Sequence, residues 1–353
     1  MTSSQADASL DIEQRGQVVA YLRASGRIGV GEEPEVRVLA GGVSNRTVLV
    51  KRPNGEAWVL KQALEKLRVA VEWHSDPRRI EREALGMRHL EILAAPGSIP
   101  ALLFEDERHH LLAMAAVPEP HENWKTLLLR GQVERDHVAQ FGRLLGAIHR
   151  GSHERRDELA ALFEERAFFE SLRLEPYYLY SAAHVPAAAP FLHALVAETR
   201  ATRQALVHGD YSPKNILVHH GRLILLDHEV IHWGDPAFDL GFSLAHFLSK
   251  AHHLAAPRAT FADAAGDYWR AYRDSLGDVP WSGGLETRAV RHTLACLLAR
   301  VAGRSPLEYL NATERARQGE VVLDLMTDAP DELPKLINAF LQRIEHKESH
   351  GSH

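Results

Sequence analysis

The stretch VHGDYSPKNIL at 207–217 is followed by LILLDHEV at 223–230. Asp210 and Asn215 share the first segment, and the second is an apolar run that leads into Asp227. Hydrogen-bond acceptors clustered between two hydrophobic runs are costly to bury unless they hold something positive. These two segments therefore predict a site for a cation or a cationic group.

The composition is that of an ordinary globular protein, since 45% of the 353 residues are hydrophobic and 25% are charged. A net charge of −6 argues against binding nucleic acid through a basic face. No apolar run reaches the roughly 18 residues of a membrane span, and the first residues lack the layout of a signal peptide. Cys296 is the only cysteine, so no disulfide can form within the chain. We expect a cytoplasmic protein without a nucleic-acid or membrane partner.

The N-terminal third is expected to be rich in strands. Residues 47–62 contain two apolar, β-branched runs around RPNGE, in which Asn54-Gly55 is a strong hairpin signal. One strand is expected before this hairpin and two more within 99–117, separated by the polar EDERHH. Residues 77–93 are expected to form a helix that Asp76 can cap.

The segment PEPHEN at 118–123 has two prolines and no apolar residue, so it is expected to be a linker. Beyond it, apolar residues recur at helical spacing. Helices are expected at 136–151, 191–204, 239–254, 261–276, 285–303, 312–327 and 331–346. The exception is 204–230, where two short strand-like runs enclose polar loops. Residues 347–353 are expected to be a disordered tail.

Phosphoryl transfer is one chemistry that suits the polar loop. It needs a carboxylate near the attacking hydroxyl, oxygen ligands for Mg²⁺ and a cation for the nucleotide phosphates. Asp210, Asn215 and Asp227 would supply the oxygen atoms. The five-residue step from Asp210 to Asn215 lets one loop present both side chains to a common cleft.

Other interpretations stay open at this point. His208-x-Asp210 with a later histidine matches the two-histidine, one-carboxylate pattern of iron sites, although the chain has 22 histidines to choose from. Ser212, His208 and an aspartate would make a hydrolase triad, but no G-x-S-x-G surrounds Ser212. A structural loop whose acceptors cap local backbone is the remaining alternative.

Three motifs in order resemble one family. HGDYSPKN at 208–215 fits the H-x-D-x-x-x-x-N catalytic loop of protein kinases and of the aminoglycoside phosphotransferase / choline kinase-like small-molecule kinases. LLDHEV at 225–230 is similar to the D-x-E of the latter group, and WGDPAFDL at 233–240 to its G-D-P-x-x-D-L segment. The resemblance implies an α+β, bilobal protein-kinase-like fold, with a small β-rich N-terminal lobe and a larger helical C-terminal lobe.

The resemblance also implies a division of labour along the chain. Residues 1–117 would form the nucleotide-binding lobe, 118–123 the linker, and 124–346 the catalytic and substrate-binding lobe. The cofactors would be Mg²⁺ and ATP, with GTP as an alternative nucleotide. The reaction would move the γ-phosphate to a hydroxyl of a small molecule.

Roles follow from the same resemblance. Asp210 matches the catalytic residue that orients the substrate hydroxyl and accepts its proton, and Asn215 and Asp227 match the metal ligands. His208 is expected to brace the loop. Lys214 would serve either the γ-phosphate or only the surface.

Lys61, at the end of AWVLK, occupies the place of the family's phosphate-binding lysine. Its partner is predicted from helical spacing within 77–93. Glu83 falls on the apolar stripe of that helix, whereas Glu81 points elsewhere, and a carboxylate on a buried stripe needs a cation. We therefore expect Lys61 to pair with Glu83.

The remaining nucleotide contacts are expected from two segments. A phosphate-covering loop belongs between the first two strands, although GGVSN departs from the G-x-G-x-x-G of protein kinases. The strand that leads into the linker should carry the adenine-facing backbone. The residues concerned are Gly41, Gly42, Ser44 and Asn45 in the loop, and Met114, Ala115 and Val117 in the strand.

The acceptor is less well defined by the sequence. The family takes aminoglycosides, choline, methylthioribose, macrolides and others, so the fold does not decide the substrate. Arg173, Tyr177 and Tyr178 lie in an aromatic-rich segment that would line a pocket or pack in the core, and Glu229 is a further candidate. A sugar-like, amino-alcohol or aminoglycoside-type acceptor is expected, and the slight excess of acidic residues after residue 117 is compatible with a cationic one. The competing class is a non-catalytic nucleotide-binding protein of kinase shape.

Overall fold

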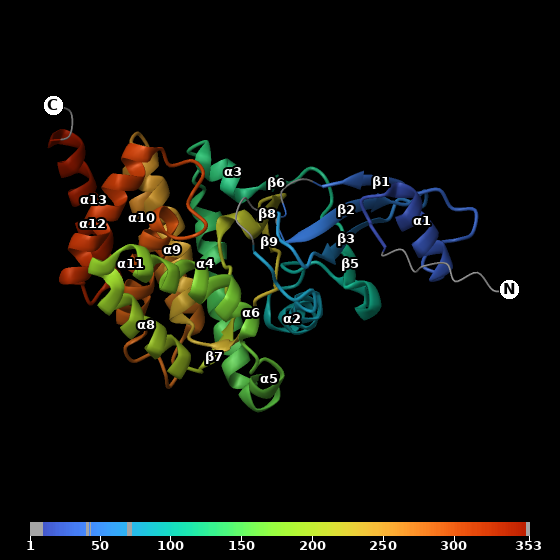
Figure 1. The fold of residues 1–353 in the computed structure, drawn as a ribbon, viewed down its shortest axis with the longest axis horizontal. Coiled ribbons are helices and arrows are strands. Elements are labelled where there is room, and N and C mark those ends of the chain that lie inside the picture. Colours follow the sequence, from blue (N-terminus) through green and yellow to red (C-terminus); the bar gives the residue numbers. More distant parts are fainter. Residues whose placement is uncertain (1–9, 40–41, 43, 69–72, 351–353) are drawn as a thin grey trace.

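The computed structural model describes residues 10–39, 42, 44–68 and 73–350. Its N-terminal part is a five-stranded antiparallel sheet in the order β1-β2-β3-β5-β4 (Figure 1). The strands are β1 (Glu35–Val38), β2 (Asn45–Lys51), β3 (Ala57–Ala63), β4 (Leu102–Asp106) and β5 (Leu111–Ala115). The expected hairpin is present, because β2 pairs with β3 from Lys51↔Ala57 onward. Gly55 in its turn has φ +91°, a value that favours glycine.

Two helices cover the sheet, and the alternation of its strands explains why. Val48, Leu60 and Ala113 pack in one cluster with the residues of α1 (Arg15–Ala24), whereas Leu112 and Met114 pack with those of α2 (Arg79–Leu93). Successive residues of a strand point to opposite faces, so one sheet supports both clusters.

Two details of these helices differ from the expectation. The helix α1 was not expected, because only three of its ten residues are buried and its apolar pattern is short. The helix α2 begins at Arg79, two residues later than expected. Asp76 still supports its start, since its Oδ1 accepts the N–H of Arg78 at 2.9 Å.

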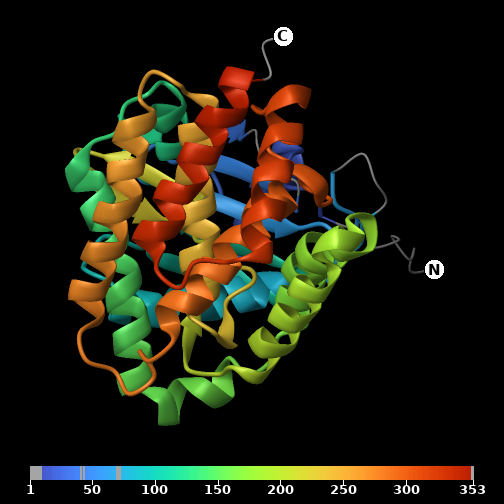
Figure 2. The ribbon, with the colours of Figure 1, turned by 90° about the vertical axis from the view of Figure 1, so that its left-hand side faces the viewer.

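The C-terminal part is mainly helical, and Figure 2 shows its helices in front of the sheet. Its α-helices are α3 (Trp124–Leu129), α4 (Arg135–Glu154), α5 (Arg156–Leu162), α6 (Ala167–Phe169), α7 (Tyr180–His184), α8 (Ala189–Ala201), α9 (Ala237–His253), α10 (Arg258–Leu276), α11 (Leu285–Ala302), α12 (Ala312–Thr327) and α13 (Leu333–His350). A π-helix, η2 (Glu170–Leu179), joins α6 to α7, and the short 3₁₀ turns are η1 (Glu107–His109), η3 (Pro186–Ala188) and η4 (Pro213–Asn215). All the helices expected after the linker are present. The α+β, two-lobed architecture is therefore confirmed.

The helix α4 anchors this lobe against α10. Val138, Phe141 and Ile148 on its expected apolar face are buried. Gly142 and Gly146 face the partner helix so closely that a Cβ on either would lie 2.5 or 2.6 Å from a backbone oxygen of α10. Glycine at these positions lets the two helix backbones approach each other.

The polar stretch forms short strands at the junction of the two parts. The linker contributes β6 (Glu122–Asn123), which pairs with β8 (Ile216–His219), and β8 forms a hairpin with β9 (Arg222–Leu225). β7 (Ala205–Val207) pairs with β10 (His232–Gly234). The loops between these strands carry the candidate functional residues.

The C-terminal tail was expected to be disordered, but it is helical as far as His350. Residues 347–350 continue α13, and Lys347 Nζ lies 2.9 Å from Glu320 Oε2 of α12. Helix continuation and this ion pair account for their order.

Within the described residues, no single helix has the length and apolar composition needed to cross a membrane. A bent pair of helical segments, Ala167–His184 and Pro186–Ala201, meets these two criteria when taken together.

Candidate active site

Lys61 joins three elements that are distant in the sequence. It lies on β3, its Nζ is 2.6 Å from Glu83 Oε1 on α2, and the same atom is 3.0 Å from Asp227 Oδ1 after β9. Glu83 is fully buried, whereas Glu81 is partly exposed, with His110 as its neighbour at 3.9 Å. The predicted pairing of Lys61 with Glu83 rather than Glu81 is thus present in the structure.

The charges of this group depend on one another. Burial raises the pKa of Glu83, and Lys61 opposes that rise. Burial alone would lower the pKa of Lys61, but Asp227 and Glu83 outweigh it and raise that pKa. Lys61 therefore stays protonated, and its cation is held ready for a further anion.

A cavity of about 850 Å³ borders Lys61. Its wall includes Asn215 and Asp227, Gly42 beside β2, and Val59 of β3. Met114, Ala115 and Val117, at the end of β5 and the start of the linker, also line it. Most of the residues predicted for nucleotide and metal binding thus surround one space between the sheet and the helical part.

The loop after β7 concentrates donors on one carboxylate oxygen. Asp210 Oδ2 lies 2.9 Å from Arg173 Nη2 and 2.8 Å from Lys214 Nζ, and it accepts the amide N–H of Asn215 at 2.8 Å. Asp210 Oδ1 is buried without a hydrogen-bond partner among the described residues. Burial favours a higher pKa for Asp210, but Arg173 and Lys214 prevail and lower it, so the carboxylate is ionised.

The backbone of this loop is fixed from behind by Asp239 of α9. Its two carboxylate oxygens accept the N–H groups of His208 at 2.7 Å and Gly209 at 2.8 Å. Gly209 has φ +76°, which favours glycine. His149 of α4 lies 3.3 Å from the same carboxylate. Asp239 thus holds the turn that presents Asp210.

His208 is committed to the loop itself. Its Nδ1 accepts the N–H of Asp210 at 3.2 Å, and its Nε2 lies 3.1 Å from Nδ1 of His228. Burial lowers the pKa of His208. With both ring nitrogens engaged, His208 is available neither to activate Ser212 nor to bind iron, so the geometry favours the bracing role.

Arg79, which is fully buried at the start of α2, was not among the residues predicted for the site. Its Nε lies 3.2 Å from Glu229 Oε2, and its Nη2 donates to the carbonyl oxygens of Ser44 and Leu64. The signal was present in the spacing, since Arg79 precedes Glu83 by one helical turn and shares its face.

The residues predicted for the phosphate-covering loop and for acceptor binding differ in what surrounds them. Ser44 and Asn45 are buried, and Asn45 Nδ2 lies 3.4 Å from Glu229 Oε2. Gly41 lies outside the described residues. Tyr178 is fully buried, and its hydroxyl contacts His292 Nδ1 at 2.9 Å, so its surroundings are those of the core.

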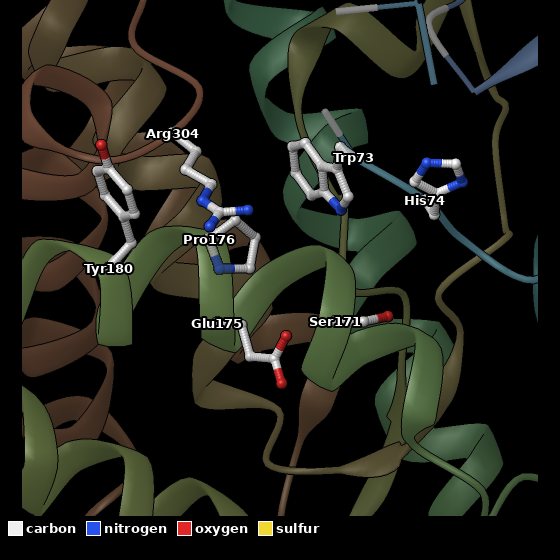
Figure 3. Close-up of a pocket in the computed structure, with 7 residues that line it drawn as sticks. All are labelled: Trp73, His74, Ser171, Glu175, Pro176, Tyr180 and Arg304. Carbon is white, nitrogen blue, oxygen red and sulfur yellow. The ribbon is translucent and has the colours of Figure 1, made fainter. Parts of the chain in front are cut away.

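A second cavity, of about 330 Å³, lies beside η2 (Figure 3). Trp73 and His74 face it from one side, and Glu175, Pro176 and Arg304 from the other. Arg173, which binds Asp210, belongs to the same π-helix as Glu175 and Pro176. Space for a second small molecule is thus present along η2.

A charge-removing substitution tests the role of Glu83. We expect Glu83→Gln to weaken nucleotide binding about tenfold, because it removes the carboxylate that fixes Lys61. Glu81→Gln removes the same charge two residues away and should leave binding unchanged. Isothermal titration with a non-hydrolysable ATP analogue measures both. If Glu83→Gln and Glu81→Gln bound the ATP analogue with equal affinity, Glu83 would not be the residue that positions Lys61.

Comparisons with known proteins show the family of this chain. The model of the phosphotransferase enzyme family matches residues 35–274. Methylthioribose kinase of Pectobacterium carotovorum is 25% identical over an alignment of length 284, and the match covers 70% of this chain and 68% of that protein.

Solved structures share the fold. The macrolide 2′-phosphotransferase of Brachybacterium faecium has a TM-score of 0.51 at 21% identity, covering 89% of this chain and 99% of its own. An amicoumacin kinase in complex with AMP-PNP, Ca²⁺ and its antibiotic has a TM-score of 0.54 at 14% identity, covering 86% and 91%. Because the family model spans well over half of the sequence, the chain belongs to the phosphotransferase enzyme family and is a small-molecule kinase.

Proposed function

We propose that this small-molecule phosphotransferase transfers the γ-phosphate of ATP to a hydroxyl of its acceptor, with Mg²⁺ as the cofactor. The observation that carries the proposal is the meeting of Lys61, Asn215 and Asp227 at the wall of one cavity of about 850 Å³. A cation for phosphates and oxygen ligands for a hard metal are the groups that phosphoryl transfer needs.

The donor set suits Mg²⁺. The amide nitrogen of Asn215 donates hydrogen bonds to the carbonyl oxygen and to Oδ2 of Asp210, which leaves its own carbonyl oxygen for a metal. Asp227 lines the cavity and contacts Lys61 through Oδ1, so Oδ2 would be the oxygen that binds the metal. When bound, Mg²⁺ would neutralise charge on the phosphate oxygens.

Asp210 is the proposed catalytic residue. Its unpaired Oδ1 would accept the acceptor's hydroxyl proton as that oxygen bonds to the γ-phosphorus and the bond to the β-phosphate oxygen breaks, releasing ADP. Arg173 and Lys214 hold Oδ2. They fix the carboxylate and keep it ionised, so Lys214 contributes at the site rather than only at the surface.

The cavity also supports the proposed division of the chain. Residues 1–117 would bind the nucleotide through β2, β3 and the β5 backbone, with Gly42 near the phosphates. Residues 118–123 would act as the linker, and 124–346 would carry catalysis and the acceptor. Ser44, Asn45 and Glu229 would support the nucleotide side through Arg79 rather than contact it.

The names of the relatives support a small hydroxylated acceptor, since they include a kinase of methylthioribose and a phosphotransferase acting on macrolides. We place the acceptor beside η2, where Arg173 contacts Asp210 and the Tyr177 ring lies next to Arg173. Tyr178 is left out because its hydroxyl is occupied in the core.

Ligand stabilisation tests the proposal. Mg·ATP at about 100 times its dissociation constant should stabilise the fold by roughly 2.7 kcal/mol, and EDTA should remove most of that gain. Thermal shift measures both, and a screen of hydroxylated metabolites and antibiotics for acceptor-stimulated ADP release tests turnover. A non-catalytic nucleotide binder would respond to ATP without any acceptor-dependent ADP. The absence of a shift with any nucleotide would refute the proposal.

A further inference from the structure

Arg300 of α11 is unlike the other arginines buried in the described part of the chain. Arg79 contacts Glu229, Arg173 contacts Asp210, and Arg258 contacts Glu348. Arg300 is 6% exposed and makes its hydrogen bonds to the carbonyl oxygen of Ser305 and to a histidine, without a carboxylate partner. A buried cation without a counter-charge is costly.

Lys250 of α9 adds a second buried basic group nearby. Its side chain is fully buried, and its Nζ donates to the carbonyl oxygen of His246 at 3.3 Å. His246 Nε2 lies 3.2 Å from Arg300 Nη2. Burial, followed by Lys125, lowers the pKa of Lys250 to about 7, and the only carboxylate that opposes this is Glu308.

Glu308 offsets these basic groups only in part, since Lys125 acts on its carboxylate more strongly than Arg300 does. Glu308 is occupied by an ion pair with Lys125, and its side chain is 66% exposed. Tyr309 contributes its ring, over which the Lys250 ammonium lies at 5.4 Å. After burial, the charges of Arg300, Lys250, Lys214 and Lys125 all lower the pKa of His246. Basic side chains from several elements therefore converge on His246.

Aromatic rings connect this cluster to the catalytic loop. Arg300 lies 4.8 Å from the ring centre of Tyr177 and 5.0 Å from that of Phe242. Arg173, which binds Asp210, lies 5.9 and 6.0 Å from the same two rings. The two guanidinium groups thus share one aromatic wall, and Lys214 binds Asp210 as well.

We propose that Arg300, Lys250 and His246 form a subsite for an anionic group of the acceptor. The acceptor would be a hydroxylated small molecule that carries a carboxylate or a phosphate ester. Its anion would bind this cationic cluster, and its hydroxyl would reach Asp210 along the wall of Tyr177 and Phe242. His246 accepts from Arg300 through Nε2, so as a neutral ring it keeps a proton on Nδ1 to donate.

This inference deepens the proposed function and rests on it. The transfer itself is unchanged: the acceptor oxygen gains the γ-phosphoryl group, ADP leaves, and the hydroxyl proton passes to Asp210. What the cluster adds is selection by charge. A cationic acceptor such as an aminoglycoside would meet like charges here, whereas an acidic one would supply the missing counter-charge.

Matched acceptor pairs test the selection. ADP release should be stimulated at least tenfold more by D-gluconate, D-glycerate or glycerol 3-phosphate than by D-glucose or glycerol, and not at all by kanamycin or choline. The carboxylate and phosphate members show which anion fits. Turnover of neutral or cationic acceptors, with the acids inactive, would overturn this inference while leaving the kinase function intact.

Direct binding keeps the test independent of turnover. With the nucleotide site filled by Mg·AMP-PNP, calorimetry should detect inorganic phosphate bound to the wild type, and Arg300→Gln and Lys250→Met should each weaken it at least tenfold. Arg291→Gln removes the same charge from the same helix, at a residue paired with Glu198, and should bind phosphate as the wild type does. Failure of Mg·AMP-PNP to bind would count against the proposed function instead.

The kinetic signature separates this role from a structural one. For an acidic acceptor that is turned over, Arg300→Gln and Lys250→Met should each raise the KM of the acceptor at least tenfold. The kcat should stay within about threefold of the wild type, and the KM of ATP should not change. Phosphate binding equal in wild type and Arg300→Gln, or absent from the wild type, would refute the subsite.

Discussion

Replacing Asp210 by asparagine is expected to reduce phosphate transfer by about 10³-fold and to leave Mg·ATP binding nearly unchanged. The substitution keeps the size of the side chain and its place between Arg173, Lys214 and Asn215. It removes the basic oxygen that would take the hydroxyl proton. The loss should therefore appear in kcat rather than in the KM of ATP.

The pH dependence adds a second check on Asp210. A general base acts above its pKa, and Arg173 and Lys214 hold the pKa of this buried carboxyl below its ordinary value. The carboxylate is consequently ionised across about pH 5 to 9, and its titration should not limit the rate there. A fall in rate on the acidic side of the pH profile that shifted when Lys214 was replaced would contradict this expectation. It would show that the pKa of Asp210 is not held low by its neighbours.

A matched variant controls for the loss of one charge. Asp136→Asn removes a carboxylate from the exposed start of α4, where the side chain is 74% exposed, and should leave turnover unchanged. Because the variant Asp210→Asn leaves Arg173 and Lys214 without their counter-charge, its thermal unfolding must be recorded alongside. A folded Asp210→Asn protein with normal turnover would remove Asp210 from the catalytic role.

The elements near the site could largely be predicted from the sequence because their signals are local. The Asn54-Gly55 turn fixed the β2–β3 hairpin, and the 3.6-residue period of 77–93 distinguished Glu83 from Glu81. Both conclusions depend only on neighbouring residues. The loop that carries Asp210 and Asn215 was predicted in the same way, as a short motif followed by an apolar strand.

The missing parts of the site depend on contacts between distant segments. Arg79 acquires its role only when Ser44, Leu64 and Glu229 meet it in space. Arg300 is one of many arginines in the sequence, and its lack of a counter-charge is visible only when the neighbouring helices are in place. The small acidic excess of the C-terminal part is compatible with a cationic acceptor, whereas the buried basic group Arg300 lies against the Tyr177 ring of η2. A sum over a lobe does not report the field at one site.

Replacing Asp227 by asparagine is expected to abolish the metal-dependent part of nucleotide binding, a weakening of about 10²-fold, and to reduce turnover by about 10³-fold. Asp227 has φ +68°, a backbone region that asparagine also tolerates and alanine does not, so this change tests the carboxylate rather than the backbone. The loss has two physical parts, because the same side chain is the proposed ligand of Mg²⁺ and contacts Lys61 at 3.0 Å.

Calorimetry with a non-hydrolysable ATP analogue, with and without EDTA, separates these two parts. Removing the metal should weaken binding to the wild type but should barely change the already weak binding to Asp227→Asn. Asp331→Asn, at a side chain that is 70% exposed, should behave as the wild type does. Asp227→Asn could instead bind the analogue as tightly as the wild type and lose that affinity with EDTA. The metal would then be bound by other residues, and Asp227 would not be its ligand in the cavity of about 850 Å³.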